Sequence, residues 1–366
     1  MLVGVMLAAD YSGANETRER DFQAALEEAA ELVRATGGEL VQVESAKRDR
    51  AHSALFVGTG KAEELAEAVR LNEIELVVFN HELTPTQERN LEKALQCRVL
   101  DRVGLILAIF AQRAQSQEGR LQVELAQLTH LSGRLVRGYG HLQSQRGGIG
   151  LKGPGETQLE TDRRLINQKI AAFKRQLKNV EKQRATRRKA RLRGSLKTFA
   201  LVGYTNTGKS SLFNRLTKAD VLAKDQLFAT LDTTARRLYL SPECSVIITD
   251  TVGFVRDLPH SLVAAFSATL EETALADVLL HVADVSHPQV ERQEEDVNLV
   301  LEEIGAGDVP QLMVYNKTDL LPAEKRPKGI LRNARGMPVA VYLSVKEGWG
   351  LEDLRDAMVE LAQAGD

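Results

Sequence analysis

The sequence predicts an α/β protein of three parts: an N-terminal parallel α/β domain over residues 1–115, an antiparallel helical hairpin with a glycine-rich loop over 116–197, and a doubly wound α/β domain over 198–366. Strand-like and helix-like segments alternate in the first hundred residues and again after Thr198, which is typical of parallel sheets covered by helices. Two apolar helical stripes lie between these regions. A chain of 366 residues is also too long for one ordinary core.

The first domain is expected to form from short apolar runs that alternate with amphipathic stretches. Continuous apolar runs indicate buried strands, whereas apolar residues spaced three and four apart indicate helices. Strands are predicted at 3–8, 39–43, 54–57, 75–80 and 98–100, and helices at 17–36, 61–71 and 84–95. The segment Gly58-Thr59-Gly60-Lys61 lacks the second half of a phosphate-loop motif, so it is interpreted as a plain strand-to-helix turn.

Two apolar stripes predict the helical hairpin. They consist of Leu121, Leu125, Leu128, Leu131 and Leu135, followed by Ile166, Ile170, Phe173, Leu177 and Val180. Steps of three and four place each set along one helix face, so the two helices should pair. Residues 133–155 between them include eight glycines, and so long a loop inside a compact protein is uncommon unless it is functional.

The alternation of strands and helices returns after Thr198 and predicts the third domain. Strands are predicted at 199–203, 236–240, 244–250, 278–285, 311–315 and 339–343. Helices are predicted at 210–218, near 259–275, at 290–304 and at 351–362.

The near-neutral total charge conceals a strongly basic middle. The formal net charge is −2, but residues 1–100 carry −7, residues 101–197 carry +14 and residues 198–366 carry −9. Residues 163–197 alone hold fourteen Lys or Arg and a single acid, Glu181. A solvated helix normally mixes both signs, so this run favours nucleic-acid phosphate as a partner, recognised by shape and charge. The residues expected to bind RNA are Arg163, Arg164, Lys174, Arg175, Arg187, Arg188, Lys189 and Arg191.

A phosphate-binding loop is predicted at residues 203–210, between a strand and a helix. Backbone N–H groups of a glycine-rich turn and of a helix N-terminus bind phosphate oxygens. Lys209 is expected to reach the β- and γ-phosphates, and the Ser210 hydroxyl to ligate Mg²⁺. The expected nucleotide contacts here are Gly203, Tyr204, Thr205, Asn206, Thr207, Gly208, Lys209, Ser210 and Ser211.

Two further segments are expected to complete the phosphate and metal side. Asp250-Thr251-Val252-Gly253 ends an apolar strand, where Asp250 can hold Mg²⁺ through water and Gly253 can donate its amide to the γ-phosphate. Thr230, within Phe228-Ala229-Thr230-Leu231-Asp232, is expected to be the second protein ligand of Mg²⁺, with Thr233 and Thr234 as rivals. The predicted catalytic residues are Lys209, Thr230 and Gly253.

The segment Asn316-Lys317-Thr318-Asp319 predicts that the base is guanine. The Asp319 carboxylate can accept hydrogen bonds from N1–H and the exocyclic amine of guanine, whereas adenine offers no such donor pair. A site rejects a ligand strongly when that ligand would leave buried polar groups of the site without hydrogen-bond partners. Ser344-Val345-Lys346 occupies the place where Ser-Ala-Lys usually backs the base. The predicted reaction is the hydrolysis of GTP to GDP by a P-loop GTPase domain.

The whole set of motifs resembles the HflX family of translation-associated GTPases over nearly the entire chain. The most specific mark is the run at 147–160, Gly-Gly-Ile-Gly-Leu-Lys-Gly-Pro-Gly-Glu-Thr-Gln-Leu-Glu, followed by Asp162-Arg163-Arg164. Thr233 stands where many GTPases of this broad class have proline, and many relatives carry a further C-terminal domain.

The resemblance implies association with the large ribosomal subunit, through its rRNA and proteins, and a role in translation: ribosome splitting, rescue or biogenesis. In related GTPases an asparagine at the loop position of Asn206 helps to bind potassium. K⁺ is therefore a second expected ion beside Mg²⁺. The chain is expected to act as a monomer.

Two other functions stay open at this point. The protein could be a regulatory GTPase switch that acts on protein partners, or an ATP-using enzyme that remodels RNA, with ATP bound within residues 1–100. The apolar run at 2–9 is too short for a membrane span and lacks a basic leader, and Cys97 and Cys244 have no metal-site spacing. A cytoplasmic protein without membrane insertion is expected.

Overall fold

The structure is a computed structural model that describes residues 1–10, 15–137, 161, 163–180, 196–218, 227–228, 230–256, 259, 262–263 and 266–364. The chain divides into two compact units. Unit 1 comprises Met1–Gln112 and Arg120–Leu177, and unit 2 comprises Arg113–Gly119 and Lys178–Asp366. The three-part division with boundaries near 115 and 197 stays a prediction.

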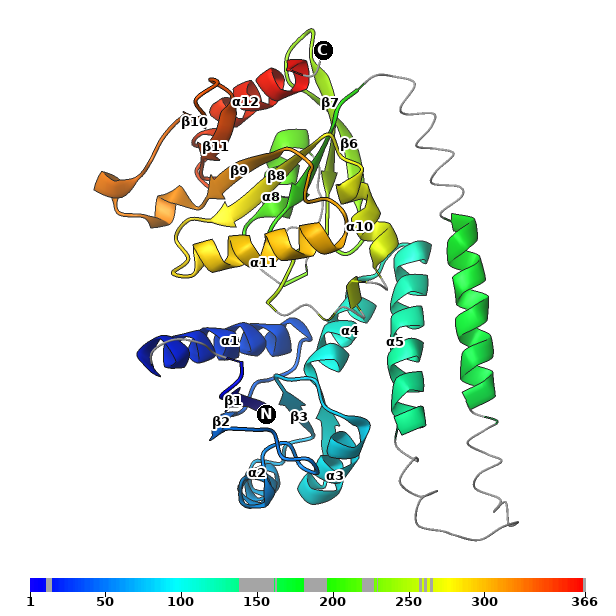
Figure 1. The fold of residues 1–366 in the computed structure, drawn as a ribbon. Coiled ribbons are helices and arrows are strands. Elements are labelled where there is room, and N and C mark those ends of the chain that lie inside the picture. The colour runs from blue at the N-terminus through cyan, green and yellow to red at the C-terminus, as the bar shows by residue number, and fades with distance from the viewer. Residues whose placement is uncertain are drawn as a thin grey trace. The chain divides into compact units, whose positions relative to one another are not determined.

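Unit 1 contains a four-stranded parallel sheet, in the order β2 (Val43–Arg48), β1 (Leu2–Leu7), β3 (Leu76–Phe79), β4 (Arg98–Leu100) (Figure 1). Its strands alternate along the chain with α1 (Asn15–Ala35), α2 (Thr59–Leu71) and α3 (Pro85–Leu95), and α4 (Arg102–Arg113) follows β4. Apolar side chains from the strands and from α2 and α3 form one buried core. The predicted parallel α/β architecture is confirmed.

The structure of unit 1 differs from the predictions in three places. Residues 39–42 precede the sheet, and β2 begins only at Val43. Residues 54–57 form no strand: His52 and Phe56 exchange backbone hydrogen bonds of 2.8 and 2.9 Å across a tight turn that buries Phe56 in the core. Helix α4 was not predicted, because its residues are buried on nearly every side and show no polar stripe.

The Gly58-Thr59-Gly60-Lys61 segment lies at the start of α2, where Gly58 adopts a left-handed φ of 90°. The Lys61 ammonium pairs with the carboxylates of Glu44 (2.7 Å) and Glu64 (3.0 Å). Since these acids neutralise the lysine, the geometry agrees with a structural turn.

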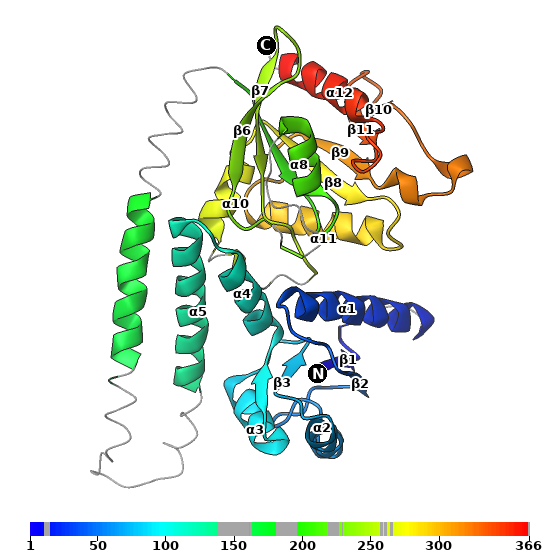
Figure 2. The ribbon, with the colours of Figure 1, turned by 180° about the vertical axis from the view of Figure 1, so that it is seen from behind.

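Unit 1 also contains most of the two hairpin helices: α5 (Gln117–Arg137) from Arg120 onward, and a helix over residues 163–180 up to Leu177. Figures 1 and 2 show them side by side and antiparallel, as predicted. The apolar stripe of α5 is interrupted, because Leu131 is 45% exposed. The last turns of α5 instead contact α3 and the end of β4 through charges: Arg134 binds Glu88 and, at 2.8 Å, the fully buried Asp101.

Several predictions for the middle region lie outside the described residues. These are the glycine-rich tip beyond residue 137 and the basic residues Arg187, Arg188, Lys189 and Arg191. Among the helices of the described ranges, none has the length and apolarity required to cross a membrane.

Unit 2 contains a seven-stranded sheet in the order β10 (Ile330–Arg332), β11 (Pro338–Tyr342), β9 (Gln311–Asn316), β8 (Val278–Asp284), β5 (Thr198–Val202), β7 (Ser245–Asp250), β6 (Thr234–Tyr239). The five central strands are parallel, and the edge strands β10 and β6 are antiparallel to their neighbours. The short β10 was not predicted.

Helices cover both faces of this sheet, as the doubly wound prediction requires. α8 (Lys209–Thr217) and α12 (Leu351–Gln363) share a core with one face, whereas α10 (Ser267–Ala274) and α11 (Val290–Glu303) cover the other (Figures 1 and 2). The carboxyl ends of the central strands therefore meet at one edge, where open α/β sheets bind ligands.

Candidate functional site

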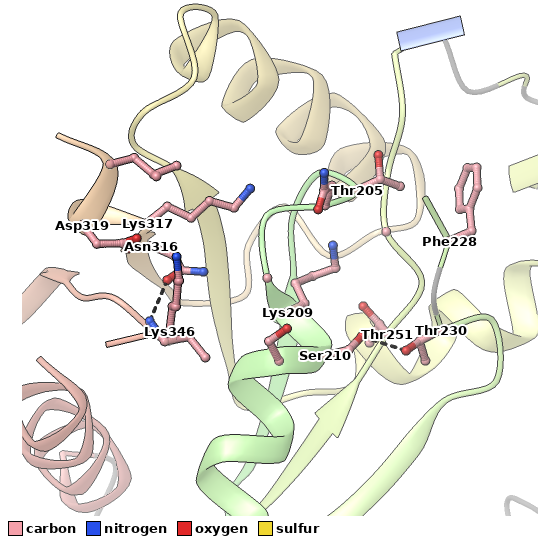
Figure 3. A pocket seen from close by; sticks show the side chains of 16 residues that line it. Thr205, Lys209, Ser210, Phe228, Thr230, Thr251, Asn316, Lys317, Asp319 and Lys346 are labelled. Atoms are coloured by element: carbon pink, nitrogen blue, oxygen red, sulfur yellow. Dashed lines mark hydrogen bonds between the residues drawn. The ribbon is translucent and has the colours of Figure 1, made fainter. Parts of the chain in front are cut away.

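A cavity of about 530 Å³ lies at the carboxyl edge of the sheet in unit 2 (Figure 3). Its lining combines all the segments predicted to bind nucleotide: Thr205, Asn206, Gly208, Lys209, Ser210, Ser211, Phe228, Thr230, Thr251, Gly253, Asn316, Lys317, Asp319, Val345 and Lys346. Leu320 also lines the cavity and was not predicted, because no motif marks the residue after Asp319.

The other predicted nucleotide contacts do not line this cavity. They are Gly203, Tyr204, Thr207, Leu231, Asp232, Asp250, Val252, Thr318 and Ser344, while Ala229 lies outside the described residues. Several of them form hydrogen bonds with residues that line the cavity.

The phosphate loop has a backbone that only glycine accommodates easily. Gly208 has a φ of 95°, and a Cβ added there would lie 2.3 Å from Asn316 Nδ2. That amide is 2.8 Å from Thr207 O, to which it donates. The phosphate loop therefore packs closely against Asn316 at the end of β9. This contact brings the loop next to the segment predicted to bind the base.

Lys209 begins α8 and is one of the lysines that line the cavity. Its Nζ donates to Gly203 O (2.9 Å) and Tyr204 O (2.6 Å). Burial lowers the pKa of Lys209 to about 8, although the nearby carboxylate of Asp250 opposes this shift. The side chain is thus an ammonium at neutral pH, in the position where a P-loop lysine binds phosphate.

Three oxygen-bearing side chains meet beside Lys209 and could hold Mg²⁺. Thr230 Oγ1 lies 2.8 Å from Ser210 Oγ and donates to Asp250 Oδ2, also at 2.8 Å. Asp250 Oδ1 is buried without a hydrogen-bond partner among the described residues. Oxygen ligands of this kind suit Mg²⁺, so the predicted ligands Ser210, Thr230 and Asp250 fit this ion.

Burial affects the ionisation of Asp250. It raises the pKa of this carboxyl group, while hydrogen bonds from Ser210 and Thr230 and the charge of Lys209 act in the opposite direction. A divalent cation at this point would favour the ionised carboxylate.

The base side of the cavity is assembled from the loops after β9 and β11. Asn316 Oδ1 accepts the N–H of Val345 at 3.1 Å, and Asp319 Oδ1 accepts the hydroxyl of Ser344 at 2.5 Å. The Lys317 ammonium pairs with Asp284 at 2.8 Å. Asp284, at the end of β8, was missed by the sequence analysis, because nothing in its own segment indicates a contact with Lys317.

Asp232 makes contacts that its sequence position does not predict. Within unit 2, its carboxylate accepts the backbone N–H groups of Gln115 (2.9 Å) and Ser116 (2.7 Å) and the Ser116 hydroxyl (2.5 Å). Ser116 Oγ in turn accepts the N–H of Gly119 at 2.8 Å, the pattern of a helix N-cap. Asp232 therefore links the segment that holds Thr230 to the first turn of α5.

Replacing Asp232 with alanine is expected to speed amide hydrogen exchange at Gln115 and Ser116. Hydrogen bonds to a charged group contribute about 1.5–3 kcal/mol, so exchange should rise by roughly one to two orders of magnitude. The control is Asp308→Ala, an exposed aspartate of the same unit. Equal exchange in the two variants would show that Asp232 does not restrain this turn.

Comparison with protein families finds GTPase models over most of the chain, between residues 23 and 317. Three family models match in succession: "GTP-binding GTPase N-terminal" over residues 23–111, "GTP-binding GTPase Middle Region" over 113–191 and "50S ribosome-binding GTPase" over 198–317. The crystal structure of SsGBP with GDP aligns over 99% of this chain and 98% of its own, with a TM-score of 0.52. At 22% identity that likeness shows a shared fold.

Curated GTPases have a much higher sequence identity to this chain than SsGBP has. GTPase HflX of Escherichia coli (strain K12) is 52% identical over 344 residues, which are 94% of this chain and 80% of that protein. GTPase HflX of Magnetococcus marinus is 50% identical over 333 residues, which are 91% of this chain and 76% of that protein. With these identities, three consecutive family matches and a phosphate loop facing a guanine motif across one cavity, the chain belongs to the HflX family of GTPases.

Proposed function

We propose that this GTPase binds the large ribosomal subunit in the cytoplasm through its basic hairpin, and that it acts there in ribosome splitting, rescue or biogenesis. The observation that carries the proposal is the charge of residues 163–197, fourteen Lys or Arg against one acid. On the described part of this run, Arg163, Arg164, Lys174 and Arg175 are exposed, whereas Leu177 is buried. A basic surface of this kind suits rRNA phosphate.

The description of the family model that matches residues 198–317, a 50S ribosome-binding GTPase, supports the same partner. A switch that acts only on protein partners has no need of so many exposed cations in one segment. The large subunit therefore explains both the charge of the middle region and the GTPase domain.

Residues in and beside the cavity are proposed to carry out GTP hydrolysis. Lys209 would bind the β- and γ-phosphates, and Ser210, Thr230 and Asp250 would hold Mg²⁺. That ion, when bound, neutralises charge on the phosphates. A Cβ added to Gly253 would lie 3.0 Å from Lys209 Nζ, so the Gly253 backbone approaches the lysine closely and can present its amide to the same phosphate.

Charge reversal on the exposed face of the hairpin is expected to weaken ribosome binding. The variant carries Lys174→Glu and Arg175→Glu, and its cosedimentation with large subunits is measured over a salt series with a non-hydrolysable GTP analogue. Each lost phosphate contact reduces the magnitude of the slope of log binding constant against log salt concentration by about one. The loss of two contacts should therefore reduce it by roughly two. The same reversal at Arg187, Arg188 and Lys189, outside the described residues, is expected to act in the same direction.

The matched control carries Lys328→Glu and Arg335→Glu, two exposed cations of unit 2, and has the same net charge. It should bind ribosomes like the parent, and GTP binding should survive in both variants. If the hairpin variant and the parent bind equally at every salt concentration, the basic run is a solvated surface and the proposal fails.

A further inference from the structure

Arg326 contacts the backbone on both sides of Leu320. It follows the 3₁₀ turn Ala323–Lys325, and its Nη2 donates to Asp319 O at 2.9 Å. Its Nε donates to Leu321 O at 2.8 Å. Because the guanidinium is planar and rigid, its two bonds fix the local path of the chain that carries Asp319.

The same guanidinium lies over the indole ring of Trp349, with 5.1 Å between Arg326 Cζ and the ring centroid. A cation at this distance is attracted to the face of the ring. The carbonyl of Trp349 accepts the N–H of Ser344 at 3.1 Å. Ser344 in turn donates its hydroxyl to the Asp319 carboxylate at 2.5 Å.

These contacts form a closed ring around Asp319. Arg326 holds its backbone, Ser344 holds its carboxylate, and Trp349 contacts both Arg326 and Ser344. The ring adds to the contacts between the loop after β9 and the loop after β11. Neither Arg326 nor Trp349 lines the cavity or belongs to a nucleotide-binding motif.

We propose that Arg326 and Trp349 are positioning residues for base recognition, and that they set the guanine specificity of the site by fixing the Asp319 carboxylate. Hydrogen bonds weaken steeply when their distance or angle departs from the optimum. A carboxylate that can shift therefore loses part of its preference for guanine, even though its own chemistry is unchanged.

The test compares GTP with inosine triphosphate, ITP, which lacks the exocyclic amine of guanine. The ratio of the two affinities reports the bond to that amine, and calorimetric titration of the full chain measures it. Arg326→Ala should lower the GTP-to-ITP ratio by roughly tenfold, the value of one charge-assisted hydrogen bond. The matched control Arg335→Ala, an exposed arginine of the same unit, should leave the ratio unchanged.

Two further variants cover the case in which Arg326→Ala does not fold. Arg326→Lys keeps the charge without the paired donors and should give an intermediate ratio. Trp349→Leu removes the aromatic face but leaves both hydrogen bonds of Arg326, so it should lower the ratio by less than Arg326→Ala. A uniform loss of GTP and ITP affinity, with the ratio preserved, would show a merely structural role and overturn the proposal, as would unchanged binding of both nucleotides.

Discussion

Asp319→Asn is expected to change the preferred nucleotide from GTP to xanthosine triphosphate. Asp319 presents two acceptors, which match N1–H and the exocyclic amine of guanine. Asparagine presents one acceptor and one donor, and xanthine has a carbonyl oxygen where guanine has that amine. The exchange therefore leaves the guanine amine facing a donor, while xanthine gains a hydrogen bond. Since Ser344 orients Asp319 Oδ1 at 2.5 Å, the replaced group should keep its place.

The size of this change should be large. Sites built on buried hydrogen bonds discriminate against mismatched ligands by factors on the order of 10⁴. Direct titration of both nucleotides measures the change, with Asp308→Asn as the control for the loss of one surface charge. Unchanged GTP affinity in Asp319→Asn would refute the assignment of the base-reading residue.

Large ribosomal subunits are expected to accelerate single-turnover GTP hydrolysis by roughly 10³–10⁵, the effect of completing a GTPase site from outside. Phe254 follows Gly253, where many GTPases have a glutamine that orients the attacking water. Phe254 is 1% exposed and does not line the cavity. Its backbone N–H donates to Gly203 O (3.1 Å), and its carbonyl accepts the N–H of Thr205 (2.7 Å). A buried phenyl ring cannot bind that water, so the free protein should hydrolyse GTP slowly.

The control for this measurement is the small ribosomal subunit at the same concentration, which should have no comparable effect. A parallel series in potassium and in sodium tests Asn206, which is exposed, lines the cavity and has a left-handed φ of 60°. If K⁺ supplies charge at this position, its replacement by Na⁺ should slow hydrolysis. Fast hydrolysis by the isolated protein, indifferent to subunits and to cation, would contradict the role given to Phe254.

Most of the fold could be predicted from the sequence, because most elements are marked by local patterns. The strands of unit 2 are apolar runs that end in polar motifs, and its helices have one apolar face. Prediction failed where burial did not follow these patterns. Phe56 and Val57 fill the core from a turn, and α4 is buried on so many sides that it has no polar stripe.

The sequence by itself determined the nucleotide-binding motifs of the site, a P-loop and a guanine motif, each a short contiguous segment. This was possible because a phosphate loop needs particular backbone freedom and particular side chains at adjacent positions, as at Gly208 and Lys209. Only the tertiary structure decided which distant residues support them: Asp284 beside Lys317, Arg326 beside Asp319, and Ser116 beside Asp232. Such contacts depend on where separate elements dock, and docking follows from the packing of the whole unit rather than from local propensity.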